Sequence, residues 1–155
     1  FERREVEKSY LALVRGFTDE GGHIDYPLRE EPHKPLQSAI TDYRTLATVE
    51  LPIPIGRYNT ARYSLVEIKP LTGRSRQIRK HFHHISHPLI GDTSHGEGRH
   101  NRLFRERFEV HRLLLHAWKL TFRHPISGEE IKIKAPLPKE FERLLNEFGW
   151  EGVIG

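Results

Sequence analysis

The 155-residue sequence has no cysteine, no run of 18 apolar residues and no acidic residue between positions 69 and 87. The absence of cysteine excludes a disulfide scaffold and a thiol nucleophile, and it fits a reducing compartment, so we expect a cytoplasmic protein. The absence of long apolar runs predicts no membrane partner and no signal peptide. The chain also begins with Phe1 and continues at once into charged sequence, so we expect it to be a fragment of a longer protein.

The positive charge is concentrated in one stretch. Lys and Arg outnumber Asp and Glu by only 25 to 21, but residues 69–87 hold five Lys or Arg, while acids dominate residues 18–31. A basic patch of this kind indicates a nucleic acid partner, with a phosphate ligand or an anionic surface as alternatives. A solvated basic helix face is the remaining interpretation.

Alternating apolar residues predict a sheet of mostly antiparallel strands. The expected strands are 6–14, 23–28, 41–51, 60–69, 113–122 and 131–135. Helices are expected from Arg74 to His87 and over 139–148, residues 101–110 fit a helix or an ordered loop, and residues 1–5 fit the end of a helix. This pattern indicates one α+β domain, with a mixed, largely antiparallel sheet flanked by a few helices.

The helix expected after Thr72 has two distinct faces. Thr72 is its expected N-cap, and Pro88 follows its end because the residue before proline avoids the helical region. Its apolar stripe consists of Ile78, Phe82 and Ile85, its outward basic face consists of Arg76, Lys80, His83 and His87, and Arg79 lies at the border. The pattern suits a polyanion on the outward face and one acidic partner for Arg79.

Other kinds of chemistry find less support in the sequence. The four histidines at 81, 83, 84 and 87 raise the possibility of a metal site, but their spacing does not bring three ligands to one point, so no metal is expected. The serines lie in no nucleophile elbow, and neither phosphate-loop pattern occurs, so no nucleotide cofactor is expected. A pair of histidines acting as acid and base in a metal-free nuclease is a further alternative, and His81 with His116 is one candidate.

Four blocks of the sequence follow the order typical of one enzyme family. They are residues 8–16 (KSYLALVRG), 69–81 (KPLTGRSRQIRKH), 87–92 (HPLIGD) and 113–117 (LLLHA) with His124-Pro125. Together they resemble the RluA-type pseudouridine synthases, and the agreement extends over nearly the whole chain. Finer features at 43–50, 56–58, 91–102 and 148–150 resemble the members of this family that act on tRNA.

The resemblance implies a cofactor-free isomerisation in which a uridine of tRNA, at position 65, is flipped out and converted to pseudouridine. The implied catalytic residues are Tyr10, which packs against the uracil ring, and Arg79, which pairs with a catalytic aspartate. The expected RNA-binding residues are Arg74, Arg76, Lys80, His81 and His116. The protein is expected to be a monomer.

The catalytic aspartate itself has no counterpart here. The family carries it in an H-R-L-D block upstream of the strand that contains the tyrosine, and no such block occurs in residues 1–155. Asp25 and Asp92 belong to other blocks and are not assigned to this role. The resemblance therefore implies a pseudouridine synthase catalytic domain without its N-terminal part, and the alternative is an RNA-binding module that performs no chemistry.

Overall fold

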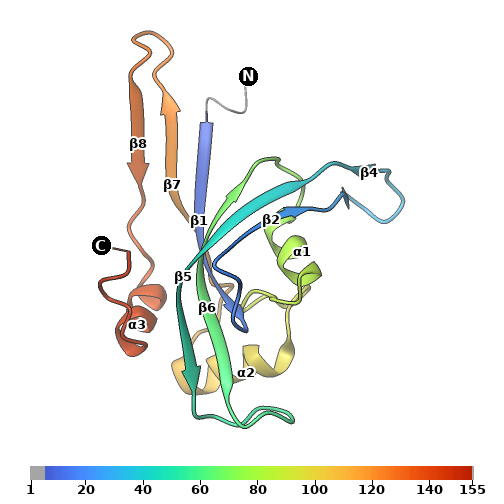
Figure 1. Cartoon of the computed structure of the whole chain (residues 1–155), viewed down its shortest axis with the longest axis vertical. Helices are drawn as coiled ribbons and strands as arrows, with labels where there is room; N and C mark the ends of the chain where they lie inside the picture. Colours follow the sequence, from blue (N-terminus) through green and yellow to red (C-terminus); the bar gives the residue numbers. More distant parts are fainter. Residues whose placement is uncertain (1–5, 155) are drawn as a thin grey trace.

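The computed structural model describes residues 6–154, and a six-stranded sheet forms their framework (Figure 1). In spatial order the strands are β2 (Gly21–Asp25), β5 (Ile40–Leu51), β6 (Ala61–Pro70), β1 (Val6–Arg15), β7 (Leu115–Arg123) and β8 (Glu130–Lys134). Neighbouring strands in this sheet pair antiparallel, which confirms the predicted α+β class. The helix end expected at residues 1–5 lies outside the described residues.

The segment between β2 and β5 contains a short two-stranded arm. Its strands are β3 (Leu28–Arg29) and β4 (Leu36–Gln37), which pair with each other and not with the main sheet. Figure 1 shows the arm extending away from the sheet, beyond β2 and above α1 (Gln77–His84). The arm contacts α1, because Lys80 Nζ donates a hydrogen bond to the carbonyl oxygen of Arg29 at 2.9 Å.

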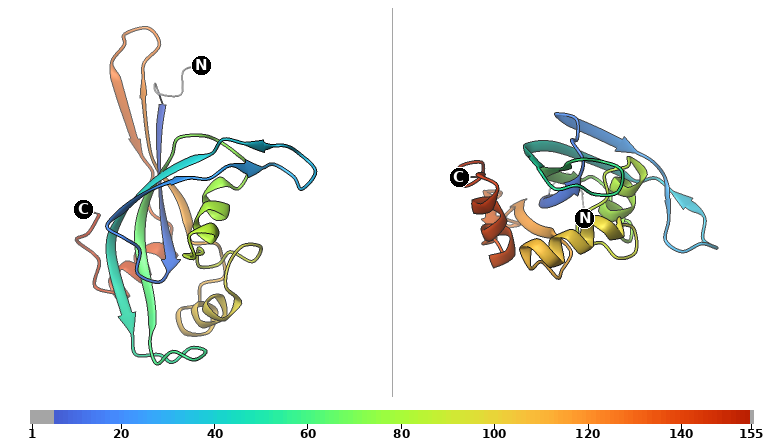
Figure 2. Two further views of the ribbon diagram at one scale, coloured as in Figure 1. Left: turned by 45° about the vertical axis from the view of Figure 1, so that its right-hand side comes forward. Right: turned by 90° about the horizontal axis from the view of Figure 1, so that it is seen from below.

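Helices cover both faces of the sheet (Figure 2). On one face α1 packs over β1 and β6, in a core of Ala12, Val14, Ile24, Val66, Ile68, Ile78, Phe82 and Leu89. On the other face α2 (Gly98–Phe108) and α3 (Lys139–Glu147) enclose a larger core that includes Leu11, Leu13, Tyr63, Leu65, Phe104, Leu114, Phe141 and Leu144. β1 is central, so residues 11–14 are all buried, whichever face they point to. None of the helices between residues 6 and 154 is long and apolar enough to span a membrane.

The apolar stripe of α1 is confirmed, but its expected start is wrong. Ile78 and Phe82 are buried, and Ile85 packs against the same core. The helix begins only at Gln77, because Arg76 adopts a left-handed backbone (φ 52°) that ends the preceding turn. Thr72 does not cap the helix; its hydroxyl instead donates to Oε1 of Gln77 at 2.6 Å.

Residues 101–110, which fit either a helix or an ordered loop, lie mostly within α2. The helix interpretation is therefore confirmed. The Glu97 side chain accepts a hydrogen bond from the backbone N–H of Arg99 and caps the helix. His100 and Phe104 face β6, where the Tyr63 hydroxyl lies 2.7 Å from Nδ1 of His100 and the Phe104 ring packs edge-on against Tyr63. The contacts of Tyr63 with His100 and Phe104 join α2 to the middle of the sheet.

The His100 contact predicts a loss of stability in acid. Burial lowers the pKa of His100 to about 4, although the neighbouring Glu97 carboxylate acts in the opposite direction. The unfolded chain, with a histidine pKa near 6.5, therefore binds more protons between pH 6.5 and 4, so acidification through this window favours unfolding. We expect His100 alone to lower the free energy of unfolding, measured with urea, by up to about 3 kcal/mol between pH 6.5 and 4.

A substitution isolates the contribution of His100 from that of the carboxylates. His100→Gln cannot take up the proton, so the variant should lose less stability than the parent between pH 6.5 and 4, whatever its stability at neutral pH. If the free energy of unfolding fell equally steeply with pH in the parent and in the variant, His100 would not cause the pH dependence.

Candidate active site

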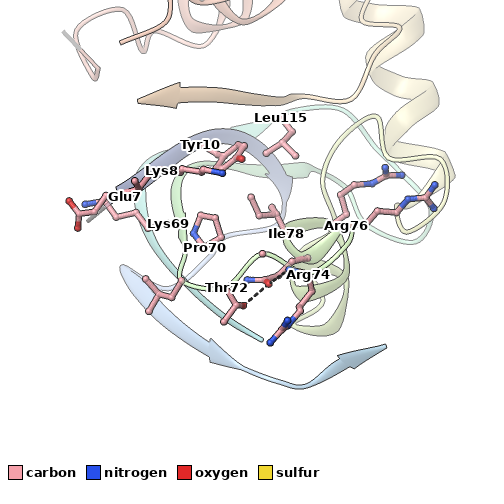
Figure 3. A pocket seen from close by; sticks show the side chains of 15 residues that line it. Glu7, Lys8, Tyr10, Lys69, Pro70, Thr72, Arg74, Arg76, Ile78 and Leu115 are labelled. Carbon is pink, nitrogen blue, oxygen red and sulfur yellow. Dashed lines mark hydrogen bonds between the residues drawn. The ribbon is translucent and has the colours of Figure 1, made fainter. Parts of the chain in front are cut away.

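A cavity of about 1120 Å³ opens between β1, the end of β6 and the start of α1 (Figure 3). Its walls come from residues 6–8 and Tyr10, residues 69–74 and 76–79, and Leu115. Among the lining residues that the structure describes, five are cationic and one, Glu7, is acidic. A roomy cavity with an apolar side and a basic side suits a ligand that combines a flat ring with negative charge.

Tyr10 lies on the apolar side of this cavity. A bulge in the pairing of β1 with β7 falls between Ser9 and Tyr10, and it sets the register that places Ala12 opposite Leu115. Tyr10 and Leu115 are half-buried and pack against the core under α1. Figure 3 shows their side chains close to Ile78, with Arg74 and Arg76 on the other side of the cavity. An aromatic ring held on an apolar wall is suited to stacking against a base.

Gln77 fixes the loop that forms the basic side. Its side chain is buried and makes four hydrogen bonds: Oε1 accepts from the Thr72 hydroxyl and the Arg74 N–H, and Nε2 donates to the Ile40 carbonyl and the Thr41 hydroxyl. All the bonding capacity of this amide is used, so the loop is tied firmly to β5. No local pattern predicts this role, because the partners of Gln77 on β5 lie 36 or more residues away in the chain.

Arg79 is held by an acidic residue of this chain. Its Nε and Nη2 donate to the two carboxylate oxygens of Asp92 at 3.0 and 2.9 Å, in a bidentate ion pair. Asp92 is thus the one acidic partner that the helix pattern predicts for Arg79, and pairing of Arg79 with a catalytic aspartate stays a prediction. The pair uses two of the five guanidinium N–H groups, so three donors remain for a second partner in the cavity that Arg79 lines.

Asp92 is a fixed part of the site. Its side chain is fully buried and also accepts hydrogen bonds from the backbone N–H groups of Ser94 and His95. Burial alone would raise the pKa of Asp92, but Arg79 and these two N–H groups outweigh it and lower the pKa below its ordinary value. The turn before it requires glycine, since a Cβ on Gly91 (φ 89°) would lie 2.2 Å from the carbonyl oxygen of Arg112. Asp92 is therefore ionised and holds Arg79 in place.

The three predicted RNA-binding cations have different environments. Arg76 is exposed at the cavity, and Arg74 also lines it while its Nε donates to the Ser38 carbonyl at 2.7 Å. Lys80 does not line the cavity and is tied to the arm through the Arg29 carbonyl. Of these three cations, Arg74 and Arg76 lie where RNA in the cavity would contact them, and Lys80 does not.

The two predicted RNA-binding histidines, His81 and His116, are not among the described residues that line the cavity. His81 is fully buried between β5 and β2: Nε2 donates to the Tyr26 carbonyl, and Nδ1 lies 2.7 Å from the Thr41 hydroxyl. His116 pairs in register with Leu11, so it points to the opposite face of the sheet, toward Phe141. For the same reason the two histidines do not form an acid–base pair.

The other histidines of residues 83–87 also point in separate directions. His83 bonds the His95 carbonyl, His84 stacks on Tyr26 with ring centroids 3.5 Å apart, and His87 bonds the Arg15 carbonyl. No group of three His, Asp or Glu side chains converges in a geometry that would hold a metal ion anywhere in residues 6–154.

Comparison with known proteins places this geometry in context. A model of the family described as RNA pseudouridylate synthase matches residues 1–84. The tRNA pseudouridine synthase C of Vibrio cholerae is 48% identical over 161 residues, which cover 97% of this chain and 66% of the relative. The protein of the same name from Yersinia pestis is 44% identical over 163 residues, which cover 99% of this chain and 63% of the relative. The chain thus spans just under two thirds of the length of these two relatives.

Solved structures agree with the sequence relatives. Human RNA pseudouridylate synthase domain containing 1 superposes with a TM-score of 0.67 at 28% identity, over 87% of this chain and 56% of that one. Human RNA pseudouridylate synthase domain containing 4 superposes with a TM-score of 0.69 over 94% of this chain and 63% of that one, and at 21% identity it supports the fold alone.

Proposed function

Because this chain belongs to the RNA pseudouridylate synthase family, we propose that it forms the uracil-binding and RNA-binding part of an enzyme that converts a uridine of tRNA to pseudouridine. The observation that carries the proposal is the cavity that combines the Tyr10 ring, the fixed Arg79 guanidinium and a basic side. Relatives named tRNA pseudouridine synthase C support tRNA as the substrate. We propose uridine 65, which the family resemblance implies, as the target.

The residues of the cavity divide the work between binding and chemistry. The target nucleotide leaves its stack, and its base enters the cavity beside Tyr10, Ile78 and Leu115. Arg74 and Arg76 contact phosphates next to the flipped nucleotide, where charge-assisted hydrogen bonds are strong. Arg79 is not needed for phosphate binding, since Asp92 already neutralises it and fixes its direction.

The isomerisation breaks the bond from C1′ of the ribose to N1 of uracil and forms a bond from C1′ to C5 of the same ring. The proton on C5 is released to the solvent, and N1 takes up a proton, so the composition of the nucleotide does not change. The family's aspartate, from the H-R-L-D block, acts on the sugar or as a base, and we propose that the free N–H groups of Arg79 hold it in its ionised form. A cytoplasmic, monomeric enzyme that needs no nucleotide cofactor remains part of this proposal.

Substitution of Tyr10 tests the function at the base-binding wall. We define the extended protein as residues 1–155 preceded by a segment that contains the family's H-R-L-D block. Its activity is measured as tritium release from tRNA labelled at C5 of uridine. Tyr10→Ala should lower the rate about 5- to 150-fold, the equivalent of one lost stacking contact of about 1–3 kcal/mol.

A conservative variant is the control for packing. Tyr10→Phe keeps the ring and its packing against the core under α1, so it should retain most of the activity if stacking is the role of the residue. The proposal fails if the extended protein releases no tritium from any tRNA, or if Tyr10→Ala releases it as fast as the parent.

A further inference from the structure

A second basic and aromatic surface lies at the end of β1 remote from Tyr10. Arg15 ends this strand five residues after Tyr10, which corresponds to about 17 Å along a strand. Around it are the tip of the β5–β6 hairpin and the start of α2, which lie beside each other in Figures 1 and 2. We call this the hairpin-tip surface, and its members are Arg15, Phe17, Arg57, Tyr58, Arg62 and Arg99.

Tyr58 is the most exposed aromatic residue of this surface. A four-residue turn, closed by two hydrogen bonds of 3.0 Å between Ile55 and Tyr58, presents the side chain to solvent, and 60% of the residue is exposed. The Arg57 guanidinium lies 5.3 Å from the centre of the ring and donates to the phenol oxygen at 3.1 Å. The ring is therefore oriented by Arg57 and left largely uncovered.

The arginines converge on this turn from three separate segments. Arg99 of α2 lies directly against Gly56, since a Cβ at that glycine would be 2.3 Å from Nη1 of Arg99. Arg15 of β1 also acts on Tyr58, and together with Arg57 and Arg99 it lowers the pKa of the Tyr58 phenol, with the Arg57 hydrogen bond as the main cause. An exposed tyrosine thus stands in a positive field that a single solvated loop would not create.

A second exposed ring continues the surface. Phe17 is 42% exposed and lies under the guanidinium of Arg62, 5.0 Å from the ring centre. Glu50 and Glu97 pair with Arg62 and Arg99, so the surface is partly neutralised. Within residues 6–154, however, Arg15 and Arg57 form no ion pair with a carboxylate. Two uncompensated cations beside two exposed rings favour an anionic partner with stackable groups.

We propose that the hairpin-tip surface is a second RNA-binding site, which binds an unpaired segment of the substrate RNA by stacking one base on Tyr58 and contacting phosphates through Arg15, Arg57 and Arg99. Single-stranded RNA is the nucleic acid that combines exposed base faces with closely spaced phosphates. The inference rests on the proposed function only in taking RNA as the substrate. It adds a site outside the catalytic cavity, one that increases affinity and does not take part in the chemistry.

Binding measurements with two RNA probes test the site. The extended protein and its variants are titrated into a labelled tRNA transcript and, separately, a blunt RNA duplex whose bases are all paired. Tyr58→Ala should weaken tRNA binding about 5- to 150-fold, the equivalent of one stacked base, and should leave duplex binding unchanged. Tyr58→Phe should bind tRNA within about twofold of the parent, because the ring remains.

The arginines are tested by the salt dependence of binding. Arg57→Ala with Arg99→Ala should reduce the slope of log affinity against log salt by one to two, at roughly 0.7 to 0.9 for each phosphate contact. The control is Arg123→Ala with Lys132→Ala, which removes the same charge from the exposed β7–β8 hairpin. An equal loss of slope in the control, or tRNA binding by Tyr58→Ala as tight as the parent's, would overturn the proposal.

Activity separates this inference from the proposed function. At saturating tRNA the hairpin-tip variants should release tritium at the parental rate, because the cavity is intact. If the parent binds tRNA through Tyr58 but forms no pseudouridine, the proposed function fails and the second binding site stands.

Discussion

Replacing Arg79 with alanine is expected to lower the rate of pseudouridine formation at saturating tRNA about 10²- to 10³-fold, the usual cost of losing one fixed donor in an active site. The reason is geometric: Asp92 holds the guanidinium with two hydrogen bonds, so that its other N–H groups are available in the cavity. The affinity for tRNA should stay within about threefold of the parent, because Asp92 already neutralises the Arg79 charge. Single-turnover tritium release and equilibrium binding measure the two quantities separately.

Arg76→Ala is the matched control, since it removes the same charge from the same cavity without touching Asp92. This variant should bind tRNA more weakly and keep the parental rate once saturated. Arg79→Ala also leaves Asp92 buried with only the Ser94 and His95 N–H groups, which costs about 3 kcal/mol or more of stability, so rates must be compared below its melting temperature. A parental rate for Arg79→Ala would reduce this arginine to a structural role.

The sequence predicted well those features that depend on local periodicity. Alternating apolar residues in β1, β5 and β6 correctly predicted the antiparallel sheet. The spacing of Ile78, Phe82 and Ile85 correctly predicted the buried face of α1. Arg79 at the edge of that stripe was correctly expected to need an acidic partner. Each of these signals lies within a few residues of the chain, where the geometry of a helix or strand is fixed.

Features that depend on long-range register were missed. His81 lies on a basic helix, but its neighbours are Thr41 and the Tyr26 carbonyl, about 40 and 55 positions away. A shift of one residue in β7 would have placed His116 on the cavity face, and no local pattern fixes that register. One available signal was overlooked: residues 69–87 contain no acid, and Asp92 is the first acid after Arg79.

Residues 1–155 by themselves are expected to form no pseudouridine on any RNA, with a rate at least about 10⁴-fold below that of the extended protein, the scale of loss when a catalytic carboxylate or nucleophile is removed. The structure supports this expectation through the acids that are present. Asp92 is fully buried and holds four hydrogen bonds from Arg79, Ser94 and His95, so its oxygens cannot reach a sugar. Within residues 6–154, Glu7 is the only acid among the residues that line the cavity.

Glu7 therefore provides the decisive control. Tritium release from C5-labelled tRNA is measured for residues 1–155 and for the extended protein, each with and without Glu7→Gln. Circular dichroism first shows that residues 1–155 are folded. If the upstream aspartate performs the chemistry, Glu7→Gln in the extended protein should keep the rate within a few-fold, since the lost charge lies beside cations and not on the reacting atoms. Turnover by residues 1–155 that disappears with Glu7→Gln would assign the catalytic carboxylate to β1, within five residues of Tyr10, and would remove the need for any aspartate from the H-R-L-D block.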